Sequence, residues 1–325
     1  MSKPRVFVSR VIPSAGVEKL REAFEVEVNE ADKPLSKPAL IRKLRGRSGL
    51  VSLLTDKIDD DICAVAGLKA VCNVAVGFDN IDLAAATRRG VLATNTPGVL
   101  TETTADFAWC LLMAAARRLG EGERMMRAGA YRGWGILMLL GQDVHAKTLG
   151  LVGLGRIGSA VARRAKGFGM RVLYSDSRRA SAEDEKRLGA RFVPLDFLLR
   201  ESDFVSLHAP LLPETRHLIG AKELALMKPT AVLVNTARGP LIDERALVKC
   251  LRERRIAAAG LDVYEREPKL AAGLARLDNA VLAPHIASAS VETRTRMALI
   301  AAENMRAALS GKRPPNLVNG DVWKN

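Results

Sequence analysis

Aromatic residues are scarce in this chain of 325 residues, where Phe, Tyr and Trp together make up 4%. Surfaces that bind single-stranded nucleic acid stack the bases on several aromatic side chains, so this composition argues against such a surface. The formal net charge is nevertheless +14. The basic residues occur in pairs such as Arg88-Arg89 and Arg254-Arg255, mixed with acidic residues, and form no long tract. We therefore expect small anionic ligands rather than nucleic acid or a membrane surface.

Paired cysteines and long apolar runs are also lacking. The four cysteines, Cys63, Cys72, Cys110 and Cys250, stand singly without a CxxC pair, and we interpret them as small buried thiols. No segment approaches the roughly 18 consecutive apolar residues of a membrane span. The first residues contain too short an apolar stretch for a signal peptide. These absences predict a cytoplasmic protein without a metal site.

Short apolar segments alternate with helical patterns along almost the whole chain, which is typical of α/β proteins with mostly parallel sheets. A length of 325 residues exceeds what one hydrophobic core usually holds and predicts two domains. Strand candidates of the first domain lie at 5–9, 49–54 and 70–77. Six strand candidates of the second, the number of a dinucleotide-binding sheet, lie at 148–155, 171–176, 204–210, 231–239, 258–265 and 280–285.

Two long helices, predicted at 101–119 and 290–311, connect the two domains. We expect the second helix to complete the first domain, so that residues 1–98 and 287–325 form a flavodoxin-like substrate-binding domain. Residues 99–286 then form a dinucleotide-binding Rossmann domain. The predicted fold class is α/β, with two Rossmann-like doubly wound parallel-sheet domains and an active-site cleft between them.

The segment LVGLGRIG at 151–158 contains the pattern GxGxxG between a predicted strand and a predicted helix. Gly153 would permit the tight turn, Gly155 would let the backbone approach a pyrophosphate, and Gly158 would let the helix pack close to the strand. The N-terminus of the helix offers N–H groups to the phosphates. With an acidic residue, Asp176, at the end of the next strand, this order of features predicts a dinucleotide site.

The acidic residue also indicates which dinucleotide is preferred. Asp176 would accept hydrogen bonds from the ribose hydroxyls and would repel a 2′-phosphate, so NAD is expected to be the preferred cofactor. Arg178 and Arg179 follow immediately and leave NADP possible as a second cofactor.

Polar side chains follow three successive predicted strands of the second domain: Arg238, Glu267 and His285. The carboxyl ends of strands in an open parallel sheet face the ligand crevice. The chain has only four histidines, so a histidine at such an end is informative, although a neutral structural histidine is the alternative interpretation.

Several longer segments resemble the D-isomer-specific 2-hydroxyacid dehydrogenases, and together they extend over nearly the full length of the chain. They are VGFDNIDLAAATRRGV, NTPGV, LVGLGRIG, LHAPLLPETRHLI, VNTARGPLIDERAL, GLDVYEREP and PHIAS. Within the family the chain is most similar to the glyoxylate and hydroxypyruvate reductases. The resemblance implies reversible, NAD(P)H-dependent reduction of a small 2-oxo acid, and a homodimer of two-domain subunits.

The resemblance also implies roles for the three polar side chains. Arg238 matches the arginine that binds the substrate carboxylate, for which the guanidinium fork is well suited. His285 matches the general acid/base, which protonates the carbonyl oxygen in reduction and removes the proton in oxidation. Glu267 matches the carboxylate that orients the histidine and favours its protonated form.

Further positions match the family's binding residues. The backbone N–H groups of Val76 and Gly77 match the loop that holds the substrate carboxylate, and Leu53 lies in a matching loop near the substrate. The positions implied to line the cofactor are Thr104, Gly153, Gly155, Arg156, Ile157, Gly158, Asp176, Ser177, Arg178, His208, Ala209, Pro210, Thr215, Thr236, Ala237, Asp262, Ala287 and Ser288.

Rival functions stay open within this resemblance. A short-form phosphoglycerate dehydrogenase or a 2-ketogluconate reductase would share the motifs, whereas a formate dehydrogenase has glutamine where Glu267 stands. A non-enzymatic alternative is an NAD-sensing corepressor, which uses the same fold to bind partner peptides. Such corepressors have long disordered tails, while this chain ends soon after its last predicted helix, so we favour the enzyme.

Overall fold

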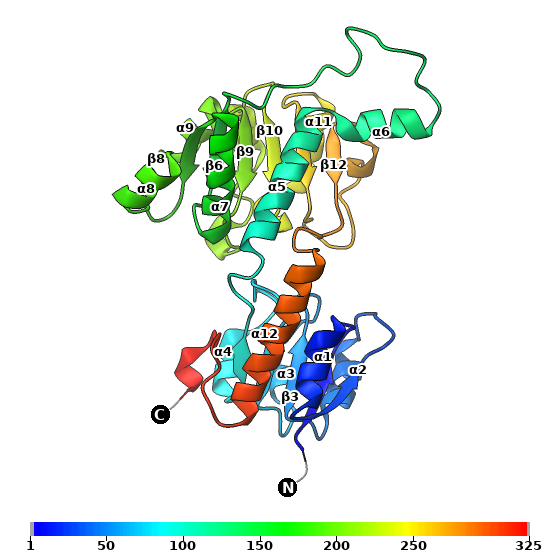
Figure 1. The fold of residues 1–325 in the computed structure, drawn as a ribbon, viewed down its shortest axis with the longest axis vertical. Helices are drawn as coiled ribbons and strands as arrows, with labels where there is room; N and C mark the ends of the chain where they lie inside the picture. Colours follow the sequence, from blue (N-terminus) through cyan, green and yellow to red (C-terminus); the bar gives the residue numbers. More distant parts are fainter. Residues whose placement is uncertain (1–2, 324–325) are drawn as a thin grey trace. The chain divides into compact units, whose positions relative to one another are not determined.

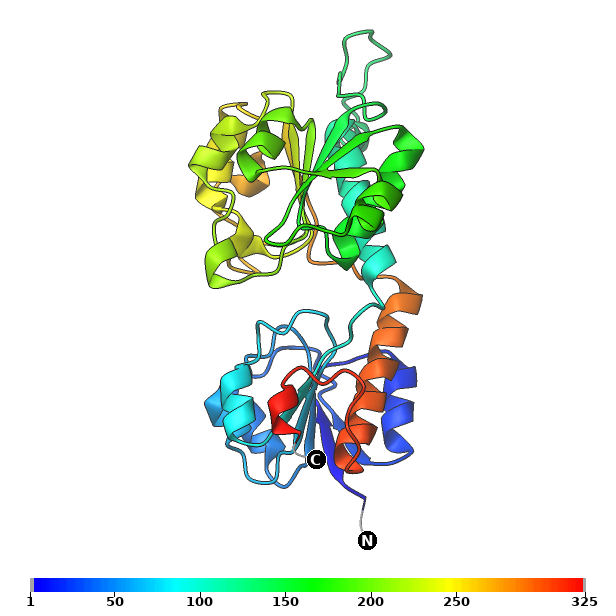
Figure 2. The same ribbon diagram turned by 90° about the vertical axis from the view of Figure 1, so that its left-hand side faces the viewer.

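The computed structural model describes residues 3–323 and divides the chain into two compact units. The first unit comprises the residues up to Leu100 together with those from Ala289 onward, and the second comprises Thr101–Ser288. In each unit, helices pack on both faces of a parallel sheet (Figures 1 and 2). None of the helices within residues 3–323 is long and apolar enough to cross a membrane.

The first unit is built on a five-stranded sheet with the order β2-β1-β3-β4-β5, in which every pairing is parallel. This is the flavodoxin-like strand order. Its strands are β1 (Arg5–Val8), β2 (Glu25–Val28), β3 (Gly49–Ser52), β4 (Ala70–Asn73) and β5 (Leu92–Thr94). Its helices are α1 (Ser14–Arg21), α2 (Lys37–Leu44), α3 (Asp60–Cys63), α4 (Leu83–Arg88) and α12 (Val291–Leu309), with a 3₁₀ turn η5 at Gly320–Val322.

Alternate side chains of the strands supply the two cores of this unit. Val6 and Val8 of β1 pack with α1 and α12 on one face of the sheet, whereas Phe7 packs with α2, α3 and α4 on the other, as the two-residue period of a strand requires. Helices α1 and α12 lie side by side (Figure 1). A Cβ at Gly16 would lie 2.6 Å from the Cβ of Ala298, so glycine at this position permits the close approach of the two helices.

The second unit is built on a seven-stranded parallel sheet with the order β12-β11-β10-β9-β6-β7-β8. Its strands are β6 (Thr148–Val152), β7 (Arg171–Ser175), β8 (Ala190–Phe192), β9 (Phe204–Leu207), β10 (Val232–Asn235), β11 (Ala258–Leu261) and β12 (Ala280–Leu282). Its helices are α5 (Thr101–Ala116), α6 (Leu119–Arg127), α7 (Arg156–Ala165), α8 (Ala182–Leu188), α9 (Leu195–Glu201), α10 (Ala221–Leu226) and α11 (Glu244–Arg252). Four 3₁₀ turns complete it: η1 (Lys166–Phe168), η2 (Pro213–Thr215), η3 (Gly239–Leu241) and η4 (Leu274–Arg276).

This strand order reverses direction between β6 and β9, as in a doubly wound dinucleotide-binding sheet. Helices α5 and α7 cover one face, where Leu149 and Leu151 are fully buried, and α9, α10 and α11 cover the other, where Leu233 is fully buried. Because all strands are parallel, their carboxyl ends lie along one edge of the sheet. Ligands of such sheets bind along that edge, near the reversal.

Three sequence-based predictions about elements and side chains were wrong. The second sheet has seven strands rather than six, because β8 is an edge strand of only three residues, too short to give an alternating pattern. The helix predicted at 101–119 ends at Ala116, and Arg118 takes a left-handed conformation (φ 52°) before α6 begins. Cys110 is exposed, whereas the other three cysteines are buried as expected.

Candidate active site

The three polar side chains predicted at strand ends lie on neighbouring strands. Arg238 follows β10, Glu267 follows β11 and His285 follows β12, and these strands are adjacent and parallel in the sheet. The loops after β10 and β11 are in direct contact, because a Cβ at Gly239 would lie 1.9 Å from the carbonyl carbon of Tyr264. The topology therefore collects a guanidinium, a carboxylate and an imidazole at one edge of the sheet.

The imidazole and the carboxylate form a hydrogen-bonded pair. His285 Nδ1 lies 2.9 Å from Glu267 Oε2, and because an ionised carboxylate only accepts, the ring N–H donates. The other oxygen of Glu267, Oε1, accepts from the backbone N–H of Tyr264 at 3.0 Å. Both side chains are partly exposed, at 27% for His285 and 32% for Glu267. The carboxylate is thus held at both oxygens, and a ring nitrogen of the imidazole, Nε2, is left to meet a substrate.

The pKa of Glu267 lies below its ordinary value. Burial raises this pKa, but the hydrogen bond and positive charge of His285, the Tyr264 N–H and the charge of Arg238 together lower it by more. The carboxylate therefore stays ionised at neutral pH. The ionised carboxylate accepts from the imidazole at Nδ1, and an imidazole that carries a proton on its other nitrogen can give that proton to a substrate oxygen.

His285 itself has a left-handed backbone conformation, with φ of 56°. For an L-residue this conformation costs about 1–2 kcal/mol, so neighbouring groups must hold it. Asp262 does so from the end of β11: its carbonyl accepts from the His285 N–H at 2.8 Å, and its carboxylate oxygens accept from Ile286 N–H and Ala287 N–H at 2.7 and 2.8 Å. Burial raises the pKa of Asp262, and these two backbone bonds oppose the rise.

The loop that presents Arg238 is fixed by Asn235, which is fully buried at the end of β10. Its amide nitrogen donates to the carbonyl of Arg238 at 2.9 Å, and its amide oxygen accepts from Ala237 N–H at 3.0 Å. The guanidinium of Arg238 also donates to the Ala237 carbonyl at 2.8 Å. A buried side chain therefore sets the direction in which the arginine leaves the sheet.

The glycine segment at the end of β6 has the geometry that a dinucleotide requires. Gly153 has φ of 96°, and a Cβ there would lie 2.9 Å from the backbone of His208 and Ala209. Gly155, which caps the N-terminus of α7, has nothing within 4 Å of a Cβ position. This open side of the loop, next to helix N–H groups without intrahelical acceptors, leaves room for a pyrophosphate. A nicotinamide dinucleotide therefore fits the residues present.

Asp176 follows β7 and lies beside the glycine segment, where its Oδ2 accepts from Leu154 N–H at 2.8 Å. Its Oδ1 lies 3.2 Å from Ser177 Oγ and 3.3 Å from the backbone nitrogen of Arg178. One carboxylate oxygen is thus oriented by the loop, and the other is near the surface, where a ribose hydroxyl can reach it.

The loop after β9 brings together the predicted residues His208, Ala209, Pro210 and Thr215. Burial lowers the pKa of His208 to about 4, so its ring is neutral at physiological pH; Nε2 lies 2.9 Å from Ser206 Oγ. Thr215 Oγ1 donates to the Pro210 carbonyl at 2.7 Å and fixes the loop. This loop is adjacent to the glycine segment, as the contact of Gly153 with His208 and Ala209 shows.

The remaining predicted cofactor positions are spread over the second unit. Thr236 follows β10, and its buried Oγ1 has no hydrogen-bond partner within residues 3–323. Thr104 is buried in the first turn of α5. The others lie in the segments already described: Arg156, Ile157 and Gly158 at the start of α7, Ala237 beside Arg238, and Ala287 and Ser288 directly after the His285 loop.

In the first unit, Leu53 follows β3, and Val76 and Gly77 follow the adjacent strand β4. Asparagine side chains hold both loops. Asn80 donates to the Leu53 carbonyl at 3.1 Å, and Asn73 donates to the Gly77 carbonyl at 3.0 Å. The structure thus brings the three predicted substrate-binding residues to one edge of the first sheet.

Several supporting residues were not predicted as such from the sequence, above all Asn235, Asn73 and Asn80. Asp262 was predicted as a cofactor contact, whereas in the structure both of its carboxylate oxygens accept from the loop after β12. The available signal was a buried-strand pattern that ends in an amide or acid, as in AVLVN and AAGLD. Such residues are expected to bind nearby backbone groups.

Comparisons with known proteins agree with this geometry. Residues 109–287 match the family described as D-isomer specific 2-hydroxyacid dehydrogenase, NAD binding domain. The chain is 56% identical to a glyoxylate reductase of Korarchaeum cryptofilum, across 99% of this chain and 98% of that protein. The structure is similar to a glyoxylate reductase from Paecilomyes thermophila (TM-score 0.86, 34% identity, 98% of this chain and 99% of that chain). It is also similar to an NADPH-dependent glyoxylate/hydroxypyruvate reductase from Sinorhizobium meliloti (TM-score 0.87, 33% identity, 100% and 99%).

Proposed function

This chain belongs to the D-isomer-specific 2-hydroxyacid dehydrogenase family, and from that premise we propose that it reduces glyoxylate and hydroxypyruvate to the 2-hydroxy acids with a reduced nicotinamide dinucleotide. The observation that carries the proposal is the His285–Glu267 pair, with a 2.9 Å hydrogen bond, on strands next to the one that presents Arg238. Reduction of a 2-oxo acid needs a cation for the carboxylate and a proton donor for the carbonyl oxygen, and these residues supply both.

In the proposed mechanism Arg238 binds the substrate carboxylate through its guanidinium fork, whose position the Asn235-anchored loop sets. His285, protonated and held by Glu267, donates the proton that the new hydroxyl group requires. The reduced nicotinamide, when bound, supplies the hydride. In the reverse direction, neutral His285 removes the proton from the hydroxyl group. Glu267 stays ionised in both directions because its pKa lies below the ordinary value.

The first unit is proposed to contribute binding rather than chemistry. The backbone N–H groups of Val76 and Gly77 would hold the substrate carboxylate, and Leu53 would contact the rest of the small substrate. Support comes from the asparagine bonds that fix the carbonyls of these loops: Asn95 donates to the Val76 carbonyl at 2.7 Å. Because asparagine side chains bind the carbonyl groups of these loops, the loops are held in place and their backbone N–H groups can donate to an anion.

We propose NADH as the preferred cofactor. Asp176 places a negative charge at the end of β7, where a 2′-phosphate would be repelled. Of the two arginines that follow, Arg179 is paired with Glu185 through two bonds of 2.9 Å, and the pKa of Glu185 is lowered to about 2 by Arg179 and by the hydroxyl of Tyr174. Arg179 is therefore ion-paired with Glu185. Arg178, next to Asp176, is the cation that we propose contacts the 2′-phosphate when NADPH binds as a secondary cofactor.

We propose that the protein is a homodimer formed through the segment that follows α6. Large apolar side chains in this segment are exposed: Trp134 at 77%, Ile136 at 71% and Leu137 at 76%. Residues 128–147 form no helix or strand. Apolar side chains gathered in one exposed segment mark an interaction surface, and a second copy of the chain is the partner that most oligomers use.

The proposed reaction is tested by initial rates with glyoxylate, hydroxypyruvate, pyruvate and 2-ketogluconate, each with NADH and NADPH. Glyoxylate and hydroxypyruvate with NADH should give the highest kcat/KM. A preference for 2-ketogluconate, or for 3-phosphohydroxypyruvate added as a fifth substrate, would instead identify one of the rival reductases. Absence of turnover with all five would contradict the enzyme and favour a binding module.

A further inference from the structure

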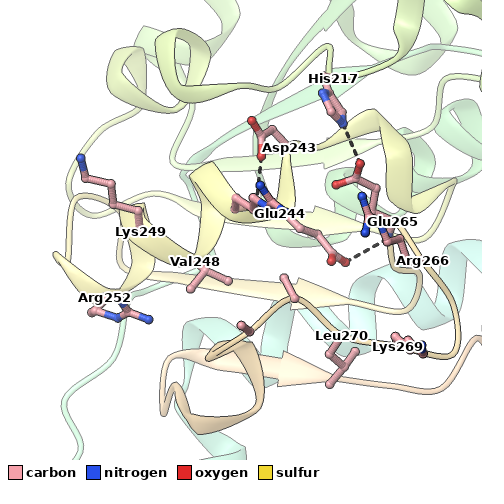
Figure 3. Close-up of a pocket in the computed structure, with 13 residues that line it drawn as sticks. His217, Asp243, Glu244, Val248, Lys249, Arg252, Glu265, Arg266, Lys269 and Leu270 are labelled. Carbon is pink, nitrogen blue, oxygen red and sulfur yellow. Dashed lines mark hydrogen bonds and ion pairs between the residues drawn. The ribbon is translucent and has the colours of Figure 1, made fainter.

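A cavity of about 770 Å³ lies in the second unit, beside the loop that carries Glu267. Figure 3 shows it between α11 and the segment that follows β11. Neither Arg238, Glu267 nor His285 lines it. Its volume is within the range of about 300–1,000 Å³ that is usual for small-molecule sites. Nothing in the proposed reaction uses this cavity, which we call the α11 groove.

Basic side chains line both walls of the α11 groove. Arg245, Lys249 and Arg252 belong to α11, and their spacing of four and three residues places them on one face of the helix, in a row about 10 Å long. Arg266 and Lys269 line the opposite wall, in a turn closed by a hydrogen bond of 2.8 Å from Lys269 N–H to the Arg266 carbonyl. Five cations therefore surround one groove from two sides.

The acidic side chains of the groove are already occupied by the protein. Asp243 caps α11 and accepts from the N–H groups of Arg245 and Ala246. Glu244 is 5% exposed and accepts from Glu265 N–H at 3.0 Å. Glu265 accepts from His217 at 3.0 Å and lies 3.4 Å from Arg216. These hydrogen bonds position the three carboxylates, and the five cations of the groove outnumber them.

Most of the basic side chains are unpaired. Lys249 lies 4.0 Å from Glu253, while Arg245, Arg252, Arg266 and Lys269 have no carboxylate within ion-pair distance in residues 3–323. The groove also has an apolar lining, in which Val248, Leu270, Ala271 and Ala272 take part. The site thus combines a basic row, in which Lys249 has an acidic partner, with an apolar patch; the row is suited to several linked negative charges and the patch to a flat ring.

We propose that the α11 groove binds a nucleoside oligophosphate, with the phosphates along Arg245, Lys249 and Arg252 and the base against Leu270. Phosphates pair well with arginine, because the guanidinium fork can donate two parallel hydrogen bonds to phosphate oxygens. The site is separate from the glycine segment, which follows β6, three strands away from β11 in the sheet. The proposal concerns binding and does not rest on the proposed reaction.

The test is calorimetric titration of the full-length protein with ATP in the presence of saturating NADH, so that the dinucleotide site is filled. ATP should bind, and more weakly as salt is added. The double variant Lys249→Glu/Arg252→Glu should lose at least about tenfold in affinity, and Lys269→Glu on the opposite wall should weaken binding as well. The matched control is Arg200→Glu, an exposed arginine on α9 away from the groove, which should stay within about twofold of wild type.

Three outcomes would overturn the proposal. The first would be that the wild-type protein saturated with NADH does not bind ATP. If the protein bound ATP only without NADH, ATP would be placed in the dinucleotide site. The second would be that the groove variants bind ATP with the same affinity as Arg200→Glu, which would place the ATP site elsewhere. The third would be that inorganic tripolyphosphate binds as tightly as ATP. This would show that the apolar lining contributes nothing to affinity and that the ligand is not a nucleoside phosphate. Circular dichroism of each variant confirms that a loss of binding is not a loss of fold.

Discussion

Arg238 carries the proposed contact with the substrate carboxylate, and Arg238→Lys separates charge from shape. The lysine keeps the positive charge but loses the planar fork. We expect a raised KM for glyoxylate and a lower kcat, with kcat/KM reduced by about 10- to 100-fold, the equivalent of one strong charged hydrogen bond. NADH affinity, measured by fluorescence titration, should stay near wild type. An equal loss of NADH binding would indicate a structural arginine instead.

Asp176 is the residue on which the cofactor preference depends. Asp176→Ser removes the charge that repels a 2′-phosphate, and an unfavourable charge contact of this kind costs about 1–3 kcal/mol when partly buried. The ratio of kcat/KM for NADH over NADPH should therefore fall by about tenfold or more. Glu183→Ser, which removes an exposed acid on α8, is the control and should leave the ratio unchanged. Tenfold preference of the wild type for NADPH would refute the role of Asp176.

At the scale of single residues, the sequence indicated which side chains follow strand ends, but not which hydrogen bonds fix their positions. Arg238, Glu267 and His285 could be predicted because parallel strands end at one edge. The left-handed backbone of His285 and the bonds from Asp262 and Asn235 could not. They depend on distances between loops that are far apart in the chain, and the loops meet only once the sheet has formed.

At the scale of elements, the unit β6–loop–α7 depends on two glycines for different reasons. A Cβ at Gly158 would lie 2.2 Å from the Gly153 carbonyl oxygen, so Gly158→Ala must push α7 away from the loop. We expect a loss of about 1–3 kcal/mol in the free energy of unfolding, as is usual for overpacking, together with weaker NADH binding. Chemical denaturation and NADH titration measure the two effects.

Gly155→Ala is the matched comparison, because nothing lies within 4 Å of a Cβ at Gly155. Its free energy of unfolding should stay near wild type, while NADH binding weakens because the methyl group enters the space proposed for the pyrophosphate. Unchanged NADH affinity in Gly155→Ala would contradict the placement of the cofactor on this loop.

The buried central strands were predictable, whereas three of the four edge strands, β2, β5 and β8, were not; the fourth, β12, lies within the predicted segment 280–285. β6, β9 and β10 are buried along their whole length, as expected of parallel strands that are covered on both faces. β5 and β8 have three residues each, and β2 reads EVEV, in which no residue is fully buried. Short or half-exposed edge strands owe their conformation to the neighbouring strand, so their own residues give little signal.

At the scale of the whole molecule, the exposed apolar segment after α6 predicts the oligomeric state. Each large apolar side chain buried at an interface contributes about 1.5–3 kcal/mol. The triple variant Trp134→Ser/Ile136→Ser/Leu137→Ser should therefore sediment as a monomer at concentrations at which the wild type is a dimer. Phe197→Ser, which removes an exposed aromatic on α9, should remain dimeric. A monomeric wild type, or a dimeric triple variant, would contradict the role of this segment.

The central claim is that His285, held by Glu267, donates the proton to the substrate during reduction. The pH dependence of single-turnover reduction of glyoxylate tests this claim most directly. Glu267→Gln removes the ionised partner of His285 Nδ1 with little change in shape, so reduction in the wild type should persist to higher pH than in Glu267→Gln, whose basic limb should move to lower pH. His285→Ala should lose about 10²- to 10⁴-fold in rate at every pH. An unmoved basic limb in Glu267→Gln, or near-normal turnover in His285→Ala, would contradict the account.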